Sequence, residues 1–281
     1  MDAPSLSTSS LSPSLSVDKL FDVRDKNVLI TGGGTGIGRM IAQGFVDNGA
    51  RVFIASRKEA TQAAAEIVRA SSRPPSRVFC RGLTADLSKG ESEQMNLLSA
   101  VARETAGKLH VLVNNAGTNW AEPVESYPIK AFEKVVALNL LAAFSLTRLA
   151  LPLLEATATL GNPARVINIG SIDGARVTLI DHFAYSSSKA ALHQLSKVLA
   201  GKLGHRHITV NTLAPGPFAS KMMKVTLARA QEEIEAGTAL GRIGSPEDMA
   251  GAALFLASRA GAYVTGAVLV VDGGILVKPR L

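Results

Sequence analysis

Short β-branched runs alternate with stretches of helical periodicity along almost the whole chain, and this alternation constrains the fold more than any other feature. Strands that alternate with helices form a parallel sheet with helices on both faces, and right-handed crossovers favour the doubly wound arrangement. The sequence therefore predicts an α/β protein. The expected strands cover residues 27–31, 51–55, 77–82, 109–113, 166–169, 208–213 and 268–271. The expected helices cover residues 40–48, 59–70, 91–105, 129–137, 140–154, 246–256 and a segment that begins near residue 185.

The chain is long enough for one large core, and its composition is that of a globular protein. It has 281 residues, of which 47% are hydrophobic and 19% charged. Residues 1–17 are rich in Ser and Pro and are predicted to be a disordered tail, which leaves residues 18–281 as a single domain. The only cysteine, Cys80, excludes an internal disulfide and is expected to pack in the core.

A net charge of +7 favours an anionic partner, and a phosphate-bearing cofactor or an acidic acyl carrier would suit it. The basic residues are scattered without a nucleic-acid motif, so nucleic acid is not predicted, and a surface that is simply basic remains an alternative. No transmembrane-length apolar run and no secretory signal are apparent. We expect a cytoplasmic protein, or a peroxisomal one if Pro279-Arg280-Leu281 acts as a relative of the Ser-Lys-Leu signal.

A glycine-rich turn follows the first expected strand and opens a helix. Its residues Gly32, Thr35, Gly36, Ile37 and Gly38 allow the backbone to approach a pyrophosphate at the positive end of that helix. The strand–loop–helix context favours dinucleotide binding over a structural turn. No metal site is predicted.

The end of the second expected strand predicts which cofactor is used. It reads Ser56-Arg57, with no acid to bind an adenosine ribose hydroxyl. An arginine there can grip a 2′-phosphate, so we predict NADP(H), although Arg57 could instead be a surface residue. Asp86, after the third strand, is expected near the adenine.

The central stretch from Arg165 to Lys202 predicts a proton-transfer site. Ser171 follows an apolar strand, and Tyr185 and Lys189 share one helix face because they are four residues apart. A cation beside a phenol lowers the phenol pKa, so we expect Tyr185 to exchange a proton while Ser171 binds the oxygen that gains charge. Alone, the Tyr–Lys pair could also be an ordinary helix pattern.

Taken together, these motifs resemble the short-chain dehydrogenase/reductase family over roughly residues 22–275. The resemblance rests on the glycine loop, Asn114-Asn115-Ala116-Gly117, Asn139, Ser171, Tyr185, Lys189 and Pro215-Gly216. It implies a single Rossmann-type sheet of about seven strands and a homo-oligomer, tetramer or dimer.

The resemblance also implies roles for individual residues. The implied catalytic residues are Tyr185 as proton donor, Ser171 as the partner of the carbonyl oxygen, Lys189 on the nicotinamide ribose and Asn139 for a proton-relay water. Among the implied cofactor-binding residues, Asp86 contacts the adenine, Asn115 the adenosine side, and Pro215, Gly216, Phe218 and Ser220 the nicotinamide end. Leu87, Ala116 and Gly117 are also expected to bind the cofactor, the last two because small residues let the backbone lie against it.

Within the family the chain looks most like NADPH-dependent 3-oxoacyl reductases of rhamnolipid synthesis, with two departures. Thr35 stands where many NADPH-using relatives have a basic residue, and the loop of residues 174–183, which should line the substrate pocket, differs. We expect reduction of a 3-oxoacyl thioester, free or carrier-bound, or of a polyketide-like ketone. Alternatives are a polyol or secondary-alcohol dehydrogenase, a cyclic-ketone reductase and a non-catalytic nucleotide sensor.

Two further residue sets are expected around the substrate, although core packing or a solvated helix face would explain them equally well. The apolar set consists of Trp120, Phe183, Phe218, Met222 and Met223. The basic set, facing an acidic carrier or a CoA phosphate, consists of Lys221, Lys224 and Arg229.

Overall fold

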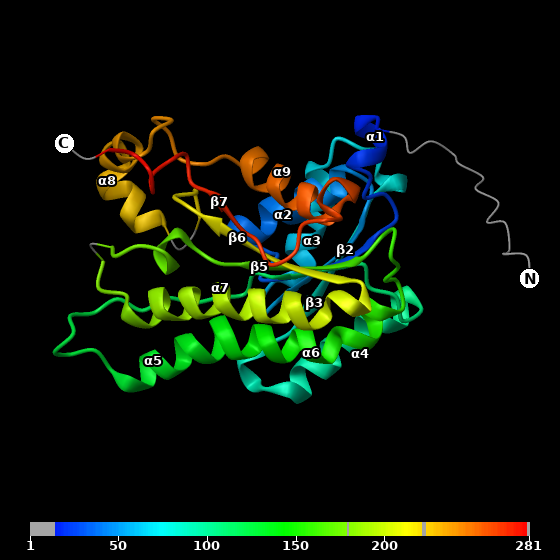
Figure 1. Cartoon of the computed structure of the whole chain (residues 1–281), viewed down its shortest axis with the longest axis horizontal. Coiled ribbons are helices and arrows are strands. Elements are labelled where there is room, and N and C mark those ends of the chain that lie inside the picture. The colour runs from blue at the N-terminus through cyan, green and yellow to red at the C-terminus, as the bar shows by residue number, and fades with distance from the viewer. Residues whose placement is uncertain (1–14, 179, 221–222, 280–281) are drawn as a thin grey trace, which may run out of the picture.

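A parallel sheet forms the centre of the molecule (Figure 1). The computed structural model describes residues 15–178, 180–220 and 223–279, without the side chains of residues 224 and 225. The strand order in the described part is β3-β2-β1-β4-β5-β6-β7, and every pairing is parallel. The strands are β1 (Asn27–Thr31), β2 (Arg51–Ser56), β3 (Phe79–Thr84), β4 (Val111–Asn114), β5 (Ala164–Ile169), β6 (Ile208–Pro215) and β7 (Val268–Val271). The predicted doubly wound α/β fold is therefore confirmed.

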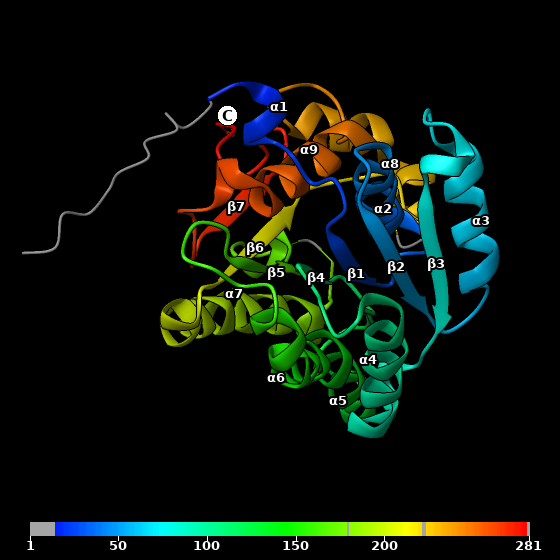
Figure 2. The ribbon, with the colours of Figure 1, turned by 90° about the vertical axis from the view of Figure 1, so that its right-hand side faces the viewer.

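Helices cover both faces of the sheet (Figures 1 and 2). Helices α4 (Glu91–Thr105), α5 (Ile129–Val136), α6 (Ala142–Glu155) and α7 (Phe183–Leu203) lie on one face. Helices α2 (Gly36–Asp47), α3 (Ala60–Ala70) and α9 (Pro246–Ala257) lie on the other. The short α1 (Val17–Leu20) precedes β1, and α8 (Lys224–Gly237) stands at the end of the molecule where the chain terminates.

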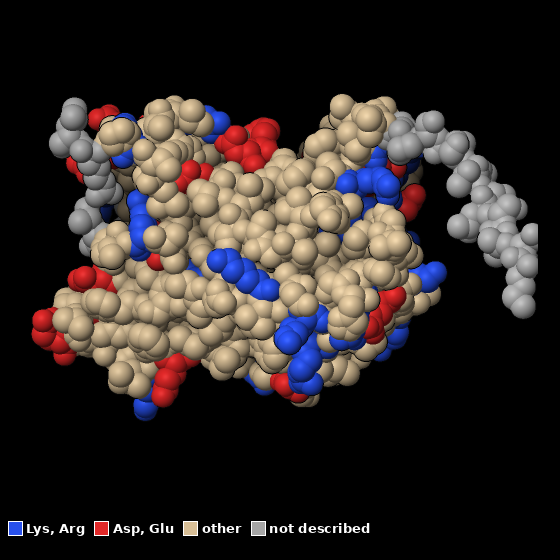
Figure 3. Space-filling view, in the orientation of Figure 1, with Lys and Arg blue, Asp and Glu red and all other residues tan. Residues whose placement is uncertain are grey.

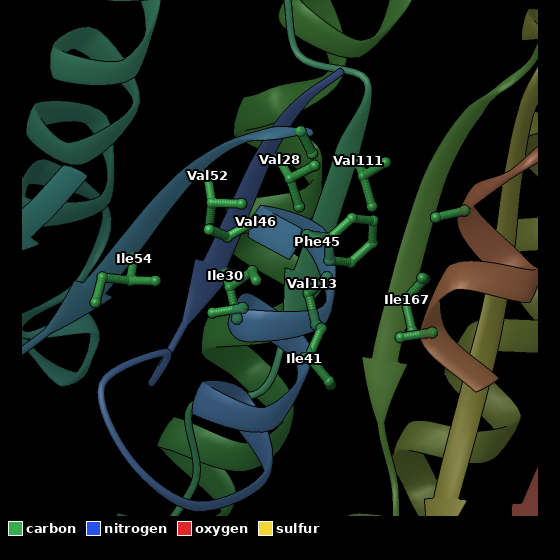
Figure 4. Close-up of a cluster of buried hydrophobic side chains, with 14 of the residues drawn as sticks. Val28, Ile30, Ile41, Phe45, Val46, Val52, Ile54, Val111, Val113 and Ile167 are labelled. Atoms are coloured by element: carbon green, nitrogen blue, oxygen red, sulfur yellow. The ribbon is translucent and has the colours of Figure 1, made fainter. Parts of the chain in front are cut away.

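Each face of the sheet buries its own hydrophobic layer, because alternate residues of a strand point to opposite faces. Val28 and Ile30 of β1 pack with Ile41 and Phe45 of α2 (Figure 4). Leu29, between them in the chain, belongs to the layer under α4 and α6. All of these side chains are fully buried. The strands are thus buried on both faces, which is why they read as continuous apolar runs.

The strand order reverses between β1 and β4, and this reversal positions the site. After β3 the chain crosses the sheet and adds β4 on the opposite side of β1. Connections that leave two neighbouring strands in opposite directions open a crevice beyond the carboxyl ends of those strands. The glycine-rich turn after β1 and the segment after β4 both lie at this edge.

Several predicted boundaries were wrong. Strand β4 begins at Val111, two residues later than expected, whereas β5 begins at Ala164 and α2 at Gly36, two and four residues earlier than expected. The third strand begins at Phe79, two residues later than expected, because Pro75–Arg77 form a 3-10 turn. The helices expected over residues 129–137 and 140–154 are one helical segment, since Ala137–Leu141 continue it as a π-helix. The expectation for Cys80 fits its place in β3, where it is partly buried and burial raises the pKa of its thiol to about 12.

This continuous segment also contradicts the expectation that no stretch reaches transmembrane length. In the described residues one helix, Ile129–Glu155, is long and apolar enough to cross a membrane, with a mean hydropathy of 1.7 in its most apolar window. The prediction failed because it broke the segment at Asn139. In the fold, α5 packs against α7, and α6 packs against α4 and β5, as expected of a helix that covers a sheet.

On the face that Figure 3 shows, the basic residues are scattered, as the sequence predicted. Lys and Arg are spread among Asp and Glu over that face. The predicted tail falls mostly on residues 1–14, outside the described residues, so the division into a tail and a domain remains a prediction.

Candidate active site

One cleft at the carboxyl edge of the sheet, with a volume of about 2220 Å³, collects nearly all the predicted site residues. Ordinary ligand pockets measure about 300–1,000 Å³, so this space is enough for a cofactor and a substrate together. The predicted residues that line it are Gly32, Thr35, Gly36, Ile37, Ser56, Arg57, Asp86, Leu87, Asn115, Ala116, Gly117, Ser171, Tyr185, Lys189, Pro215, Gly216, Phe218 and Ser220. Gly38 and Asn139 lie behind this lining.

The glycine-rich turn brings backbone N–H groups to the floor of the cleft. Gly36, the first residue of α2, has a φ of 52°, a conformation that favours glycine. A Cβ on Gly38 would lie 2.4 Å from the carbonyl oxygen of Gly32, so only glycine fits there. Thr35 caps α2 without a side-chain hydrogen bond, which leaves the first amides of the helix for an anion.

Asn115 supports this turn, in addition to lining the cleft, and its expected role on the adenosine side stays a prediction. Its Nδ2 donates to the carbonyl oxygens of Thr31 at 2.8 Å and Gly32 at 3.1 Å. The amide donors of Asn115 are therefore used within the protein. Sequence reasoning missed this role because it depends on the adjacency of β1 and β4, which are far apart in the chain.

The end of β2 forms the basic corner of the cleft. The Ser56 hydroxyl donates to the carbonyl oxygen of Lys58 at 2.8 Å, which shapes the turn that presents Arg57. Asp86 accepts from the hydroxyl and the N–H of Ser88, which, with the nearby Arg57 cation, lowers the pKa of its carboxyl group. Arg39 of α2 also lines this corner, in an ion pair with Glu66 at 2.7 Å, and was not predicted.

Ser171, Tyr185 and Lys189 meet where β5 ends and α7 begins. Ser171 follows β5 and accepts a hydrogen bond from the N–H of Asp173 at 3.1 Å, and its hydroxyl is hydrogen-bonded to the Tyr185 phenol. Lys189 lies one turn after Tyr185 and is buried. Its Nζ donates to the carbonyl oxygen of Ile169 at 2.7 Å and lies 5.5 Å from the centroid of the Tyr185 ring.

The expected effect of Lys189 on Tyr185 was wrong for this structure. Burial raises the pKa of Tyr185 to about 12, and this effect outweighs the hydrogen bond from Ser171, which lowers it. Burial also lowers the pKa of Lys189 to about 8. At neutral pH Tyr185 is therefore a neutral phenol, the form that donates a proton.

Asn139 holds the site together from behind. It lies in the π-helical turn and is buried. Its Oδ1 accepts from the N–H of Thr118 at 2.9 Å, and its Nδ2 donates to the carbonyl oxygen of Thr118 at 3.0 Å and to Ser188 Oγ at 3.1 Å. Its side-chain donors are thus filled by the protein, and it ties the segment after β4 to α7. A π-helical turn of this kind is frequently found at functional sites.

The predicted substrate-binding residues divide in two. Phe218 and Met223 line the cleft, whereas Trp120 and Phe183 do not. The Trp120 indole N–H donates to Glu122, and Phe183 packs edge-on against Tyr127 at 5.4 Å between ring centroids. Arg229 is exposed and lies outside the lining. Lys221, Met222 and the side chain of Lys224 lie outside the described residues.

A polar cluster beside Tyr185 was missed. Asp173, Arg176 and His182 all line the cleft. Arg176 and His182 belong to the loop of residues 174–183 that was expected to line the substrate pocket, and Asp173 directly precedes it. The Nε of Arg176 donates to Asp173 at 3.0 Å, and the His182 ring lies 5.2 Å from the Tyr185 ring. No spacing rule for loops would pair these residues, so the sequence carried no usable signal for the cluster.

Comparison with known proteins places this site in a family. Residues 32–276 match the family described as enoyl-(acyl carrier protein) reductase. A "short-chain dehydrogenase/reductase PhomF" of Diaporthe leptostromiformis is 32% identical over 96% of this chain and 97% of its own. The chain belongs to the short-chain dehydrogenase/reductase family.

Two bacterial comparisons sharpen the likeness of this short-chain dehydrogenase/reductase. It is 46% identical to the rhamnolipids biosynthesis 3-oxoacyl-[acyl-carrier-protein] reductase of Pseudomonas aeruginosa, over 90% of this chain and 97% of the relative. The solved structure titled "Pseudomonas aeruginosa RhlG/NADP active-site complex" superposes with a TM-score of 0.85 at 43% identity, covering 91% and 98% of the two chains. The predicted family resemblance is confirmed, and the chain is an oxidoreductase of this type.

Proposed function

We propose that this protein reduces a ketone to a secondary alcohol with NADPH, and that its substrate is a 3-oxoacyl thioester, free or carrier-bound, or a similar polyketide-like ketone. The observation that carries the proposal is the meeting of Ser171, Tyr185 and Lys189 in a cleft that also contains the glycine-rich turn and Arg57. The likeness to a bacterial 3-oxoacyl reductase supports the substrate class.

The residues of the cleft fit a phosphorylated dinucleotide. The start of α2, which has no side-chain cap, offers N–H groups to the pyrophosphate. Gly36 and Gly38 are packed closely against Ser220 and Asn115, so a side chain at either position would crowd the turn. Arg57 at the end of β2 offers a forked cation for a 2′-phosphate, with Lys58 and Arg39 in the same lining. When such a cofactor is bound in reduced form, the chemistry that it supplies is a hydride for the carbonyl carbon.

The protein's own residues would direct the proton. Tyr185, neutral because burial raises its pKa, donates its phenolic proton to the oxygen of the reacting ketone. Ser171 hydrogen-bonds the same oxygen as negative charge develops on it. Lys189 has N–H groups beyond the one bound to Ile169, and these would hold a ribose hydroxyl and stabilise the phenolate that remains.

Tyr185→Phe tests the proton donor. The substitution removes only the phenolic oxygen, so we expect NADPH affinity within about twofold and a fall in kcat of roughly 10²–10⁴-fold. NADPH oxidation with acetoacetyl-CoA, followed by nicotinamide absorbance, measures the rate, and nicotinamide fluorescence measures binding. A variant that keeps half of the wild-type activity would overturn the assignment. Assays of cyclic-ketone reduction and of polyol oxidation test the alternative substrate classes.

Arg57→Ala tests the choice of cofactor. The loss of a charge-assisted contact with the 2′-phosphate should weaken NADPH binding roughly 10- to 100-fold and leave NADH binding within about twofold. Fluorescence titration of both cofactors measures this directly. Equal weakening of the two would show that Arg57 supports the fold of the β2 turn instead.

A further inference from the structure

The loop between β5 and α7 contributes an arginine, Arg176, to the cleft that holds the proposed reaction centre. Only part of the hydrogen-bonding capacity of its guanidinium is used by the protein. Arg176 lines the cleft and is partly buried, with 26% of its side chain exposed. Its Nε donates to Asp173 Oδ1 at 3.0 Å. Among the residues that the structure describes, the two terminal nitrogens of Arg176 have no protein partner within hydrogen-bond distance. Four N–H donors therefore remain for a ligand.

Two hydrogen bonds connect this guanidinium to the catalytic serine. Arg176 is bound to the Asp173 carboxylate, and the N–H of Asp173 donates to Ser171 Oγ at 3.1 Å. Ser171, Asp173 and Arg176 line the same cleft, so a ligand that reaches Ser171 can also be contacted by Arg176. The guanidinium is also fixed before any ligand arrives, which reduces the entropy lost on binding.

His182 lies on the opposite side of Asp173 from Arg176, and these three residues form what we call the wall of the cleft. His182 is buried and packs on the Tyr185 ring at 5.2 Å between centroids. Its Nε2 lies 3.1 Å from Thr178 Oγ1 and 3.6 Å from Asp173 Oδ2, and its Nδ1 faces the amide of Asn119. The Asp173 carboxylate thus lies between the two side chains, with a hydrogen bond from Arg176 on one side and the His182 ring close by on the other.

The charges of this wall favour a neutral ligand group over an anion. The carboxylate of Asp173 offsets the cation of Arg176, and burial lowers the pKa of His182, which keeps its ring neutral. Glu233 of α8 lines the same cleft and adds a negative charge. Lys278 also lines it, but its Nζ donates to the carbonyl oxygens of Ala236 and Thr238. A carbonyl oxygen, an acceptor without net charge, is the group that the wall suits best.

We propose that Arg176, oriented by Asp173, is a specificity-determining residue that binds a second carbonyl oxygen of the substrate, close to the ketone that is reduced. The inference rests on the proposed function and deepens it. The preferred substrate is then a β-dicarbonyl compound, a ketone with an ester or thioester carbonyl nearby, and a simple ketone with an alkyl chain is a poor substrate.

Arg176→Met tests this with two ketones of similar size. Ethyl 3-oxobutanoate carries the second carbonyl, and 2-heptanone lacks it. A site built to hydrogen-bond a group discriminates strongly against substrates without it. We expect the variant to lose 10- to 100-fold in kcat/KM for the ester, mostly through KM, and less than threefold for 2-heptanone. Arg176→Lys, which keeps the charge without the planar fork, should fall between.

Arg103→Met, an exposed arginine of α4 outside the cleft, should leave both substrates unchanged. Equal losses on the two substrates would show that Arg176 merely supports the loop, and no loss on the ester would also overturn the inference. Circular dichroism confirms that each variant is folded.

A binding arm separates this inference from the proposed function. In the Tyr185→Phe background with NADPH, where turnover is expected to be roughly 10²–10⁴-fold slower, ethyl 3-oxobutanoate binding is measured through nicotinamide fluorescence with and without Arg176→Met. Weaker binding in the double variant supports the role of Arg176 even if the wild-type protein reduces no thioester. Unchanged binding rejects that role even if thioester reduction is found.

Discussion

The two ends of β5 each hold a buried cation that has no carboxylate within ion-pair distance among the residues the structure describes, and the two cations differ in what they contact. Arg165, at the start of the strand, is 1% exposed, and Lys189, whose Nζ binds the carbonyl oxygen of the last residue, is 5% exposed. Burial lowers the pKa of both, to about 10 for Arg165 and to about 8 for Lys189.

The difference lies in how many hydrogen bonds each cation makes. Arg165 donates to the carbonyl oxygens of Pro163, Leu256 at 3.1 Å and Ser258 at 3.0 Å. The last two belong to the end of α9, where a cation also meets the negative end of the helix dipole. Lys189 makes one hydrogen bond, to Ile169, and lines the cleft. A cation whose donors are used stabilises the fold, and one whose donors are left open is available for a ligand.

The largest effect should come from Lys189→Met. The substitution removes the ammonium that would stabilise the phenolate and hold the cofactor, so we expect kcat/KM to fall roughly 10²–10³-fold. Thermal stability should hold or rise, because replacing a buried charge with a similar apolar chain removes its desolvation penalty. Ketone reduction and the Tm are the measurements. If the variant lost activity and its Tm fell by 10 °C or more, Lys189 would be a structural cation like Arg165, and the contrast between the two would be wrong.

Arg165→Met should show the opposite pattern. The carbonyl groups that Arg165 satisfies would be left buried without donors, which costs about 1–3 kcal/mol each when no water reaches them. We expect the free energy of unfolding to fall by roughly 2–4 kcal/mol, measured by urea denaturation. The kcat of the folded protein should stay within twofold of wild type. Unchanged stability would mean that Arg165 is not the structural cation of the pair.

The smallest effect is a pH dependence of stability that belongs to Lys189. Its folded pKa of about 8 lies below the ordinary lysine pKa of 10.5, so between these pH values the unfolded state binds more protons. Stability therefore rises with pH over this window, by about 1 kcal/mol between pH 8 and pH 9. The difference between wild type and Lys189→Met, measured by urea denaturation, removes the contributions of other groups. A difference that is flat with pH would show that the Lys189 pKa is not lowered.

The fold was largely predictable from the sequence because its signals are local. Periodicity placed β1, β2 and α7, and Gly32 to Gly38 marked the turn after β1. The predicted ends of helices and strands were wrong where a local sequence rule allowed more than one interpretation. The polar Asn139 inside an apolar stretch suggested a break, whereas the buried amide is satisfied by Thr118 and Ser188 and the helix continues.

The sequence predicted which residues lie in the site better than it predicted the contacts that those residues make. Ser171, Tyr185 and Lys189 could be grouped because a strand end and a helical spacing of four bring them together. The direction of the Tyr185 pKa could not be predicted, since it depends on burial by segments distant in the chain. The same holds for Asn115, whose partners Thr31 and Gly32 precede it by more than eighty residues.

The sequence by itself determined the α/β architecture, the place of the glycine-rich turn and the grouping of Ser171, Tyr185 and Lys189 in one cleft. Each of these depends on hydrophobic periodicity, backbone freedom or spacing within one element. Only the tertiary structure decided that Arg165 meets the end of α9, that Lys189 keeps open donors, and that Asp173 holds Arg176 beside Ser171. Those outcomes depend on desolvation and on hydrogen bonds between side chains, and packing sets both.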